Sequence, residues 1–326
     1  MKILITGIAG FVGSHLAERL LKTENEIFGI CLPGESLENI RKIRKNLHLS
    51  NCDITRFDQL SRVVKRINPD QIYHLAALSS VGKSFSHPLD TIQTNIRGTL
   101  YLLETVRNLK KRIKILVVGS SDMYGKVLPK EVPITENKPL LPISPYGMSK
   151  AACDLLAYQY FASYGVYAIR ARAFNHTGPR QSTGFVIPDF ASQIAEIEAG
   201  QLPPILKVGN LSTKRDISDV RDVVRAYVSL MGKGKAGEAY NICSQEAYSI
   251  RNVLKILLTL SKKKIKVGVD EAKNRPAEIP ILVGNNAKIR KTTGWKPKIP
   301  VKKTLEDTLN FWRRRVKFKY LMTNVE

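Results

Sequence analysis

The chain has 326 residues, which is longer than one compact core usually requires and predicts one large or two modest domains. With 43% hydrophobic and 25% charged residues it has an ordinary globular composition, and no apolar run approaches the ~20 residues that would span a bilayer. The sequence shows no secretory signal, CxxC pair or zinc spacing, so we expect a cytoplasmic location, four reduced cysteines, no membrane partner and no metal.

The formal net charge of +24, from 52 basic and 28 acidic residues, admits three interpretations. It can attract nucleic acid, attract a polyanionic substrate, or belong to a lysine-rich surface without a specific partner. The charge is spread along the chain and is densest at residues 262–264 and 313–315, without a zinc finger, a basic zipper or interleaved aromatic residues. This pattern favours a solvated surface together with an anionic ligand, and we expect no nucleic-acid partner.

The first 120 residues alternate short β-branched runs with longer helical patterns, which is typical of βαβ units around a parallel sheet. In chain order, we expect strands at 2–6, 26–31, 71–77, 113–120 and 166–173, and helices at 14–22, 58–67, 91–109 and 146–164. The pattern predicts an α/β fold of the Rossmann type, with a doubly wound parallel sheet.

After residue 173 the pattern loosens. We expect helices at 185–199, 220–230, 250–260 and 304–315, a short strand at 238–243, and turn-rich segments at 200–204 and 274–280. These elements predict a smaller α/β lobe built from interleaved C-terminal segments. The expected division is a Rossmann domain of residues 1–174 plus 214–245 and a substrate-binding lobe of residues 175–213 plus 246–326.

Three glycines, Gly7, Gly10 and Gly13, stand directly between the first expected strand and the first expected helix. Glycine at such positions lets the backbone turn tightly and approach a pyrophosphate, while the helix N-terminus offers free N–H groups and a partial positive charge. A glycine trio alone is a weak signal because turns also use glycine. The strand–loop–helix context, however, indicates a dinucleotide cofactor.

The end of the second strand leaves the type of dinucleotide open. In NAD sites an acidic residue about 20 positions after the loop accepts the ribose hydroxyls, but residues 29–33 read GICLP, without a carboxylate. Arg41, Lys42 and Arg44 lie further on and are either ligands for a 2′-phosphate or plain surface. Since no acid stands at Cys31, we expect both NADPH and NADH to serve.

A serine, a tyrosine and a lysine form the candidate catalytic set. Tyr146 and Lys150 are four residues apart in a segment that Ser144 and Pro145 predict to begin a helix. They then share a helix face, where the ammonium group stabilises a phenolate and lowers the pKa of the tyrosine. Ser120 ends a buried parallel strand, at the edge where doubly wound sheets bind ligands. We therefore predict that Tyr146 exchanges a proton with a substrate oxygen that Ser120 holds, instead of forming a surface pair with Lys150.

Six motifs in this order resemble the extended short-chain dehydrogenase/reductase family: TGIAGFVG (6–13), CDI (52–54), HLAA (74–77), NIRGT (95–99), SSDMYG (120–125) and SPYGMSK (144–150). The resemblance covers essentially the whole chain and implies that Ser120, Tyr146 and Lys150 are the catalytic triad. It implies a cofactor site of Gly7, Gly10, Phe11, Val12, Gly13, Asp53, Ile54, Leu75, Ala76, Ala77, Asn95, Tyr146 and Lys150, with Asp53 and Ile54 beside the adenine. It also implies a homodimer through the helices at about 91–109 and 146–164.

The second half resembles the GDP-mannose branch of the same family in FNHTGPRQS (174–182), FVIPDF (185–190), KVGNL (207–211), RDISDVRD (215–222) and NRPAE (274–278). This implies a GDP-linked 4-keto-6-deoxy sugar as substrate, bound by Ser121, Asp122, Asn175, Arg215, Arg275 and Glu278. By the same resemblance, Asn175, Arg215 and Arg275 hold the diphosphate, which suits the fork of an arginine. The implied reaction is reduction of the 4-keto group of GDP-4-keto-6-deoxy-D-mannose to GDP-D-rhamnose by NADPH or NADH.

Two other functions stay open. A GDP-mannose 4,6-dehydratase, or another nucleotide-sugar epimerase or dehydratase, shares the fold, but a dehydratase also needs an acid/base for the C5 proton. The dehydratases that this chain resembles carry Glu two residues after the catalytic Ser or Thr, where Asp122 is one methylene shorter. A cofactor-sensing protein without chemistry does not need the intact catalytic set. We therefore expect a reductase in which Asp122 positions the substrate.

Overall fold

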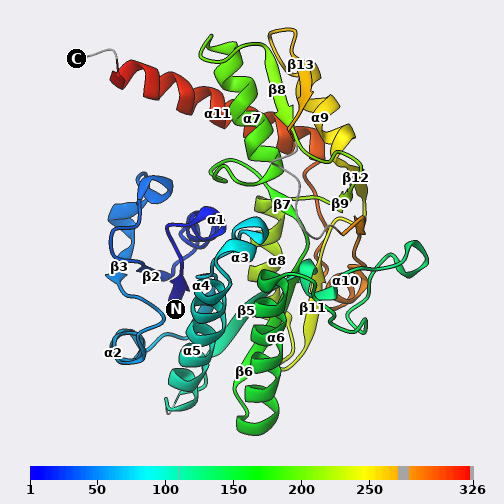
Figure 1. Cartoon of the computed structure of the whole chain (residues 1–326). Coiled ribbons are helices and arrows are strands. Elements are labelled where there is room, and N and C mark those ends of the chain that lie inside the picture. Colours follow the sequence, from blue (N-terminus) through cyan, green and yellow to red (C-terminus); the bar gives the residue numbers. More distant parts are fainter. Residues whose placement is uncertain (110, 271–278, 324–326) are drawn as a thin grey trace.

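The computed structural model describes residues 1–109, 111–270 and 279–323. Within these residues, seven parallel strands form a central sheet in the order β11-β6-β5-β4-β1-β2-β3 (Figure 1). The strands are β1 (Lys2–Thr6), β2 (Glu26–Cys31), β3 (His48–Asn51), β4 (Gln71–His74), β5 (Lys114–Ser120), β6 (Tyr167–Ala173) and β11 (Ala239–Ile242). The strand order reverses between β1 and β4, which opens a crevice at the carboxyl ends of these strands. The predicted doubly wound α/β fold is confirmed.

Helices cover both faces of the sheet because successive side chains of each strand point to opposite faces. In β1, Ile3 and Ile5 pack into one apolar cluster, whereas Leu4 packs into the other. The first cluster lies under α1 (Phe11–Leu20), α8 (Val220–Lys233) and α10 (Ala287–Thr293). The second lies under α2 (Phe57–Ile67), α5 (Gly98–Arg107) and α6 (Pro145–Tyr164). The crevice is therefore held between two packed layers.

Helix α6 follows the sequence expectation closely. Ser144 caps its N-terminus by accepting a hydrogen bond from Gly147 N at 3.0 Å, and Pro145 occupies the first turn. Gly165, with φ of +71°, ends the helix in the left-handed conformation that glycine favours. These local signals explain why the prediction of 146–164 agrees with the structure to within a residue.

Two other predicted helices differ from the structure. Helix α1 begins at Phe11, three residues before the expected start at 14, because the glycine loop runs directly into the first helical turn. The single helix expected at 91–109 is divided into α4 (Pro88–Ile92), a π-helical turn (Gln93–Arg97) and α5. The turn carries Asn95, whose side chain bonds neighbouring segments and not the helix itself.

A third apolar cluster lies above the sheet in Figure 1 and involves α7 (Val186–Glu198), α9 (Ile250–Thr259) and α11 (Val301–Thr323). Short strands accompany it: β7 (His176–Thr177), β8 (Ile205–Val208), β9 (Lys214–Asp216), β10 (Ser218–Asp219), β12 (Ala247–Ser249), β13 (Lys266–Val269) and β14 (Ile281–Leu282). Apart from the predicted smaller lobe in general, the sequence did not indicate these strands. Ile289 and Trp295, which we assigned to that lobe, pack into the Rossmann core. The residue-by-residue domain division stays a prediction.

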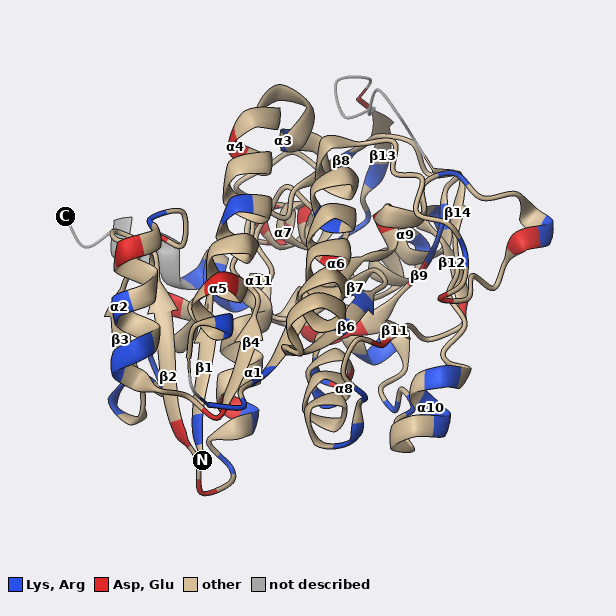
Figure 2. Ribbon diagram, turned by 90° about the horizontal axis from the view of Figure 1, so that it is seen from below, with Lys and Arg blue, Asp and Glu red and all other residues tan. Residues whose placement is uncertain are grey.

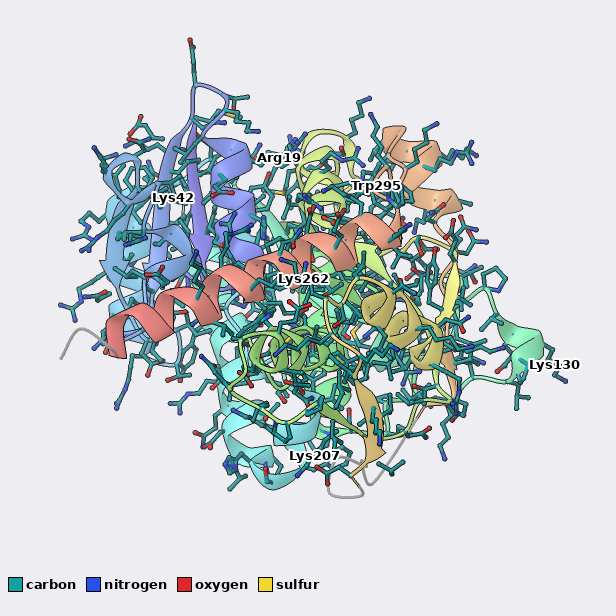
Figure 3. All side chains as sticks on the ribbon, turned by 90° about the horizontal axis from the view of Figure 1, so that it is seen from above. Arg19, Lys42, Lys130, Lys207, Lys262 and Trp295 are labelled. Carbon is teal, nitrogen blue, oxygen red and sulfur yellow. The ribbon has the colours of Figure 1, made fainter. Side chains whose placement is uncertain are left out.

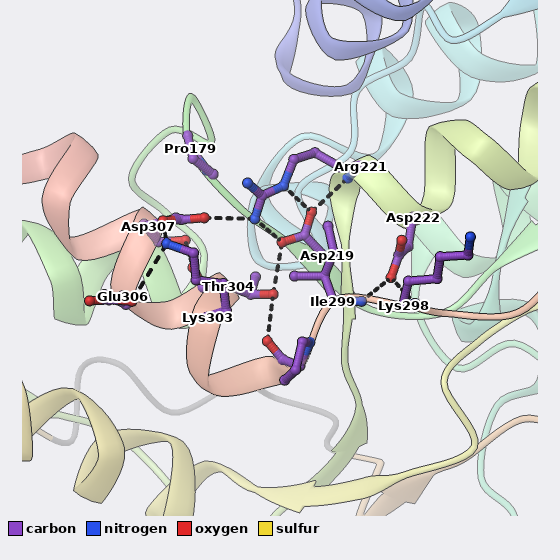
Figure 4. A network of polar contacts seen from close by, with 12 residues as sticks. Pro179, Asp219, Arg221, Asp222, Lys298, Ile299, Lys303, Thr304, Glu306 and Asp307 are labelled. Carbon is purple, nitrogen blue, oxygen red and sulfur yellow. Dashed lines mark hydrogen bonds and ion pairs between the residues drawn. The ribbon is translucent and has the colours of Figure 1, made fainter.

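A polar network ties α11 to α8 (Figure 4). Asp219 caps α8 through Arg221 N at 2.7 Å and accepts a hydrogen bond from Thr304 Oγ1 of α11 at 2.8 Å. Arg221 bridges Asp219 and Asp307 at 2.7 and 2.8 Å. Because Asp219 is buried, these charge-assisted bonds hold the C-terminal helix firmly on the Rossmann half.

The positive charge is distributed over many elements. Figure 2 shows Lys and Arg on helices as far apart as α2 and α10, and Figure 3 shows Lys42 and Lys130 on opposite sides of the molecule. Lys42, Lys130, Lys207 and Lys262 are all exposed. In the part of the chain that the structure describes, no helix has an apolar stretch long enough to cross a membrane.

Candidate active site

A cavity of about 840 Å³ lies at the carboxyl ends of β1, β4, β5 and β6, beneath the smaller lobe. Most of the predicted site residues line it: Gly7, Gly10, Phe11, Val12, Gly13, Leu75, Ala77, Ser120, Ser121, Asp122, Tyr146, Lys150, Asn175 and Arg215. The fold thus brings the glycine loop, the Ser–Tyr–Lys set and the candidate diphosphate ligands Asn175 and Arg215 to a single cavity. Its size is that of a site for a small organic molecule.

The glycine loop forms a tight cradle at one end of this cavity. Gly7 has φ of +70°, and its N–H bonds Ile30 O at 3.0 Å across to β2. A Cβ on Gly13 would lie 2.2 Å from Gly7 O, so only glycine lets α1 begin this close to the strand. The helix has Gly10 at its N-cap, without a side-chain cap, which leaves its first N–H groups for an anion. This arrangement fits the pyrophosphate of a dinucleotide.

Buried hydrogen bonds fix the segment after β4 beside the glycine loop. Thr6 Oγ1 accepts from Leu75 N at 3.2 Å and Ala76 N at 3.1 Å, and lies 2.9 Å from His74 Nδ1. Burial, reinforced by the charge of Lys150, lowers the pKa of His74 to about 3. His74 is therefore a neutral buried connector between strands.

Asn95 joins the cofactor side to the catalytic helix. Its side chain exchanges hydrogen bonds with the backbone of Leu78 at 2.8 and 3.1 Å, and donates to Ser149 Oγ of α6 at 2.9 Å. Asn95 does not itself line the cavity, and neither does Ala76, Asp53 or Ile54. Asp53 instead accepts hydrogen bonds from the backbone and hydroxyl of Thr55 just after β3. The assigned cofactor roles of these four residues stay predictions.

Ser120 and Asp122 follow β5 and are bonded to each other. Ser120 Oγ accepts from Asp122 N at 3.2 Å and donates to Asp122 Oδ2 at 3.1 Å. This local turn holds the carboxylate beside the serine hydroxyl at the floor of the cavity. Ser120 is also hydrogen-bonded to the phenol of Tyr146.

Tyr146 and Lys150 both lie buried at the start of α6. Burial, followed by the charge of Asp122, raises the pKa of Tyr146 well above its usual range, although the hydrogen bond with Ser120 opposes this. Burial lowers the pKa of Lys150. The expectation that the pKa of Tyr146 is lowered is thus wrong for this state, because burial of the phenol dominates and Lys150 is not among the groups that shift this pKa. The raised pKa means that the phenol of Tyr146 keeps its proton at neutral pH.

The strand β7 forms the opposite wall. His176 stacks on Phe11 with ring centroids 6.0 Å apart, and its Nδ1 lies 2.9 Å from Phe174 O. Burial lowers the pKa of His176, so it acts here as an uncharged wall of the cavity. Arg215 on β9 is half-buried and lines the same cavity. The predicted ligands Arg275 and Glu278 lie outside the described residues.

Several cavity residues were not predicted from the sequence. Phe190 and Asn210 lie in the motifs FVIPDF and KVGNL but were given no role, and Tyr227 of α8 lies outside every motif. His176, which had no assigned role, also lines the cavity. In the described ranges, no group of three or more His, Cys, Asp or Glu side chains is arranged to hold a metal ion.

Known proteins resemble this chain over nearly its whole length. A sequence model of the family described as GDP-mannose 4,6 dehydratase matches residues 4–308. The chain is 33% identical to the GDP-6-deoxy-D-mannose reductase of Pseudomonas aeruginosa, over 97% of this chain and 98% of that protein. It is 32% identical to the GDP-mannose 4,6 dehydratase of Homo sapiens, over 91% of this chain and 87% of that protein.

Solved structures of related proteins also match this chain over nearly its whole length. The RMD of Pseudomonas aeruginosa complexed with NADPH has a TM-score of 0.84 at 32% identity, covering 96% of this chain and 99% of that one. The UDP-glucose 4-epimerase of Thermus thermophilus complexed with NAD has a TM-score of 0.86 at 28% identity, with 96% and 99% covered. This chain therefore belongs to the GDP-mannose 4,6-dehydratase family of extended short-chain dehydrogenase/reductases.

Proposed function

We propose that this chain is an NAD(P)H-dependent enzyme that reduces the 4-keto group of GDP-4-keto-6-deoxy-D-mannose to give GDP-D-rhamnose. The observation that carries the proposal concerns the carboxylates of the cavity. Among the described lining residues these are Asp122, which holds Ser120 Oγ, and Asp189, which accepts from Gly184 N at 2.8 Å. Both are engaged by protein donors, whereas removal of a C5 proton needs a base directed at the sugar.

The cavity residues supply what a ketone reduction requires. Bound NAD(P)H would supply a hydride to the carbonyl carbon. Tyr146 gives its proton to the carbonyl oxygen, so that the C=O group becomes CH–OH, and Lys150 stabilises the phenolate left behind. Ser120 turns its hydroxyl from Asp122 to the same oxygen and holds it in place. The raised pKa of Tyr146 supports this direction, because it keeps the proton on the phenol before the reaction.

The positions of the lining residues support separate binding sites for the dinucleotide and for the GDP-sugar within the cavity. The glycine loop takes the pyrophosphate of the dinucleotide, while Asn175 and Arg215, on the opposite wall, take the diphosphate of the GDP-sugar. The reductase from Pseudomonas aeruginosa, at 33% identity, supports the keto-sugar as substrate.

A homodimer and a cytoplasmic location belong to the proposal. Leu155 and Tyr158 on α6 are 57% and 48% exposed, which supports pairing of α4–α5 and α6 with a second copy. Sedimentation at several protein concentrations tests the dimer, and charged substitutions such as Leu155→Glu should shift it toward monomer.

The competing function is a GDP-mannose 4,6-dehydratase, which the family model and the human relative favour. A dehydratase regenerates its cofactor each cycle and exchanges the C5 proton with solvent, whereas a reductase consumes one reduced cofactor per sugar. We expect GDP-mannose in deuterated water to stay unlabelled. With NADPH or NADH deuterated at C4, the 4-keto-6-deoxy sugar should give product labelled at C4 only. Solvent deuterium at C5, with a keto product and no net cofactor use, would identify a dehydratase.

A further inference from the structure

The end of β2 points one peptide group toward the glycine loop. Ile30 O accepts from Gly7 N on the β1 side, whereas Cys31 O accepts from Cys52 N on the β3 side. In a strand the N–H and C=O of one residue point to the same side, and successive residues alternate between the two neighbouring strands. The N–H of Leu32, two residues after Ile30, therefore faces β1 again. It therefore opens into the crevice between β2 and the glycine loop.

The carboxylate of Glu35 lies at the N–H of Leu32, although residues 29–33 at the end of the strand contain no acid. Leu32 N donates to Glu35 Oε2 at 3.1 Å, and Glu35 N donates to Leu32 O at 3.0 Å. The turn of residues 32–35 thus folds the side chain of Glu35 back onto the strand end. The charge lies close to Cys31, whose pKa burial and Glu35 together raise to about 11.

A neighbouring contact joins the segment that carries this carboxylate to the cofactor loop. Asn39 Nδ2 donates to Ala9 O at 3.0 Å, so the segment after the turn packs on the glycine loop. In dinucleotide-binding folds this corner receives the adenosine ribose, where an acid accepts the 2′-hydroxyl of NAD and an arginine accommodates the 2′-phosphate of NADP. Glu35 puts a negative charge there, although the strand itself ends in Cys31.

Two arginines that belong to or contact the segment after β2 already have carboxylate partners. Arg180 contacts Glu18 at 2.5 Å and Asn39 O at 3.2 Å, and Arg41 pairs with Glu38 at 3.8 Å. Lys42 and Arg44 are exposed to solvent, where their fields are screened. Glu35 is the charged side chain that bonds the backbone at the end of β2 directly.

We propose that Glu35 is the specificity-determining residue of the cofactor site and makes this chain select NAD(H) over NADP(H). The carboxylate accepts the ribose 2′-hydroxyl and repels a 2′-phosphate, since like charges placed together in an interface strongly oppose binding. The inference rests on the proposed nicotinamide cofactor but not on the sugar reaction. It adds to the expectation that both NADPH and NADH serve, because it assigns the two dinucleotides different affinities.

Equilibrium titration of the full chain with NADH and NADPH, without sugar, tests the proposal. We expect wild-type protein to bind NADH about tenfold or more tightly than NADPH. Glu35→Gln keeps an oxygen for Leu32 N, and should reduce this ratio at least about tenfold, mainly through tighter NADPH binding. Glu26→Gln is the matched control, because it removes one exposed carboxylate from the opposite end of β2, and it should keep the wild-type ratio.

Several outcomes would overturn the proposal. These are wild-type protein that binds NADPH equally well or better, an unchanged ratio in Glu35→Gln, or an equal effect of Glu26→Gln. The wild-type ratio decides the matter even if Glu35→Gln does not fold, which circular dichroism would reveal. Failure to bind either dinucleotide would reject the cofactor assignment itself, whereas normal binding without sugar reduction would reject only the proposed reaction.

Discussion

Ser120 and Asp122 bond each other twice, through Ser120 Oγ to Asp122 Oδ2 at 3.1 Å and through Asp122 N to Ser120 Oγ at 3.2 Å. The first bond orients the hydroxyl, and the second fixes the oxygen at the end of β5. The charge of Asp122 also contributes to the raised pKa of Tyr146. We therefore propose that Asp122 positions both Ser120 and Tyr146, the two residues expected to contact the substrate oxygen.

Replacing Asp122 with Asn tests this role through the pH profile. The amide oxygen still accepts the serine hydroxyl, so we expect ketone reduction to fall by no more than about tenfold, at the scale of one hydrogen bond. Loss of the negative charge favours the phenolate, so the pKa of Tyr146 should fall. The alkaline limb of kcat, where Tyr146 loses its proton, should therefore move to lower pH. A loss of hundredfold or more in rate would instead indicate that Asp122 is a catalytic base.

Replacing Tyr146 with Phe should nearly abolish turnover while leaving dinucleotide affinity close to wild type. The ring still fills its buried site, but no proton reaches the sugar oxygen, and loss of general acid catalysis typically slows a reaction about 10²–10⁴-fold. Single-turnover kinetics and equilibrium titration measure the two effects separately. Lys150→Met is the comparison, and should weaken both turnover and cofactor binding because Lys150 is proposed to contact the ribose. A Tyr146→Phe enzyme with near-normal rate would remove the catalytic assignment.

Replacing Arg215 with Ala should mainly raise the KM for the nucleotide sugar. Charge-assisted bonds to phosphate contribute about 1.5–3 kcal/mol, which corresponds to a rise of roughly ten- to hundredfold. Lys214→Ala is the matched control, since Lys214 precedes Arg215 on β9 but is exposed and does not line the cavity. Steady-state kinetics with both substrates decides the matter. Weaker cofactor binding with unchanged KM for the sugar would reassign Arg215 to the dinucleotide.

The features that the sequence predicted are those with short-range physical causes. The buried strands β1 and β5 contain continuous apolar runs, and the N-cap Ser144 with Pro145 marks the start of α6. Because strand ends of a parallel sheet meet at one edge, Ser120 and the glycine loop had to lie near each other. Local pattern and fold topology together were therefore sufficient to predict that the candidate catalytic residues and the glycine loop meet at one cavity.

The missed features depend on contacts between distant segments. Strand β3 reads His-Leu-Ser-Asn and has no apolar alternation of its own, so it forms a strand only because β2 offers it an edge. The carboxylate of Glu35 reaches the end of β2 only after a turn whose course the sequence does not specify. The pKa of Tyr146 likewise depends on the depth of burial, which a spacing of four residues cannot give.

The last prediction concerns Tyr227, a fully buried residue of α8 that lines the cavity. Among the described residues its hydroxyl has no hydrogen-bond partner. An unsatisfied buried polar group destabilises a fold by about 1–3 kcal/mol. Tyr227→Phe keeps the ring and removes this group, so without dinucleotide we expect the thermal midpoint to stay equal or rise.

Tyr240→Phe provides the matched control in the same apolar cluster. The hydroxyl of Tyr240 accepts a hydrogen bond from Lys235 N at 3.1 Å, so its loss should lower the free energy of unfolding by about 1 kcal/mol. The two variants remove the same atom from similar buried rings, and opposite signs of the midpoint shift isolate the effect of the missing partner. Scanning calorimetry of both proteins gives the comparison. If Tyr227→Phe melts as early as Tyr240→Phe, the hydroxyl of Tyr227 has a stabilising partner in the free protein.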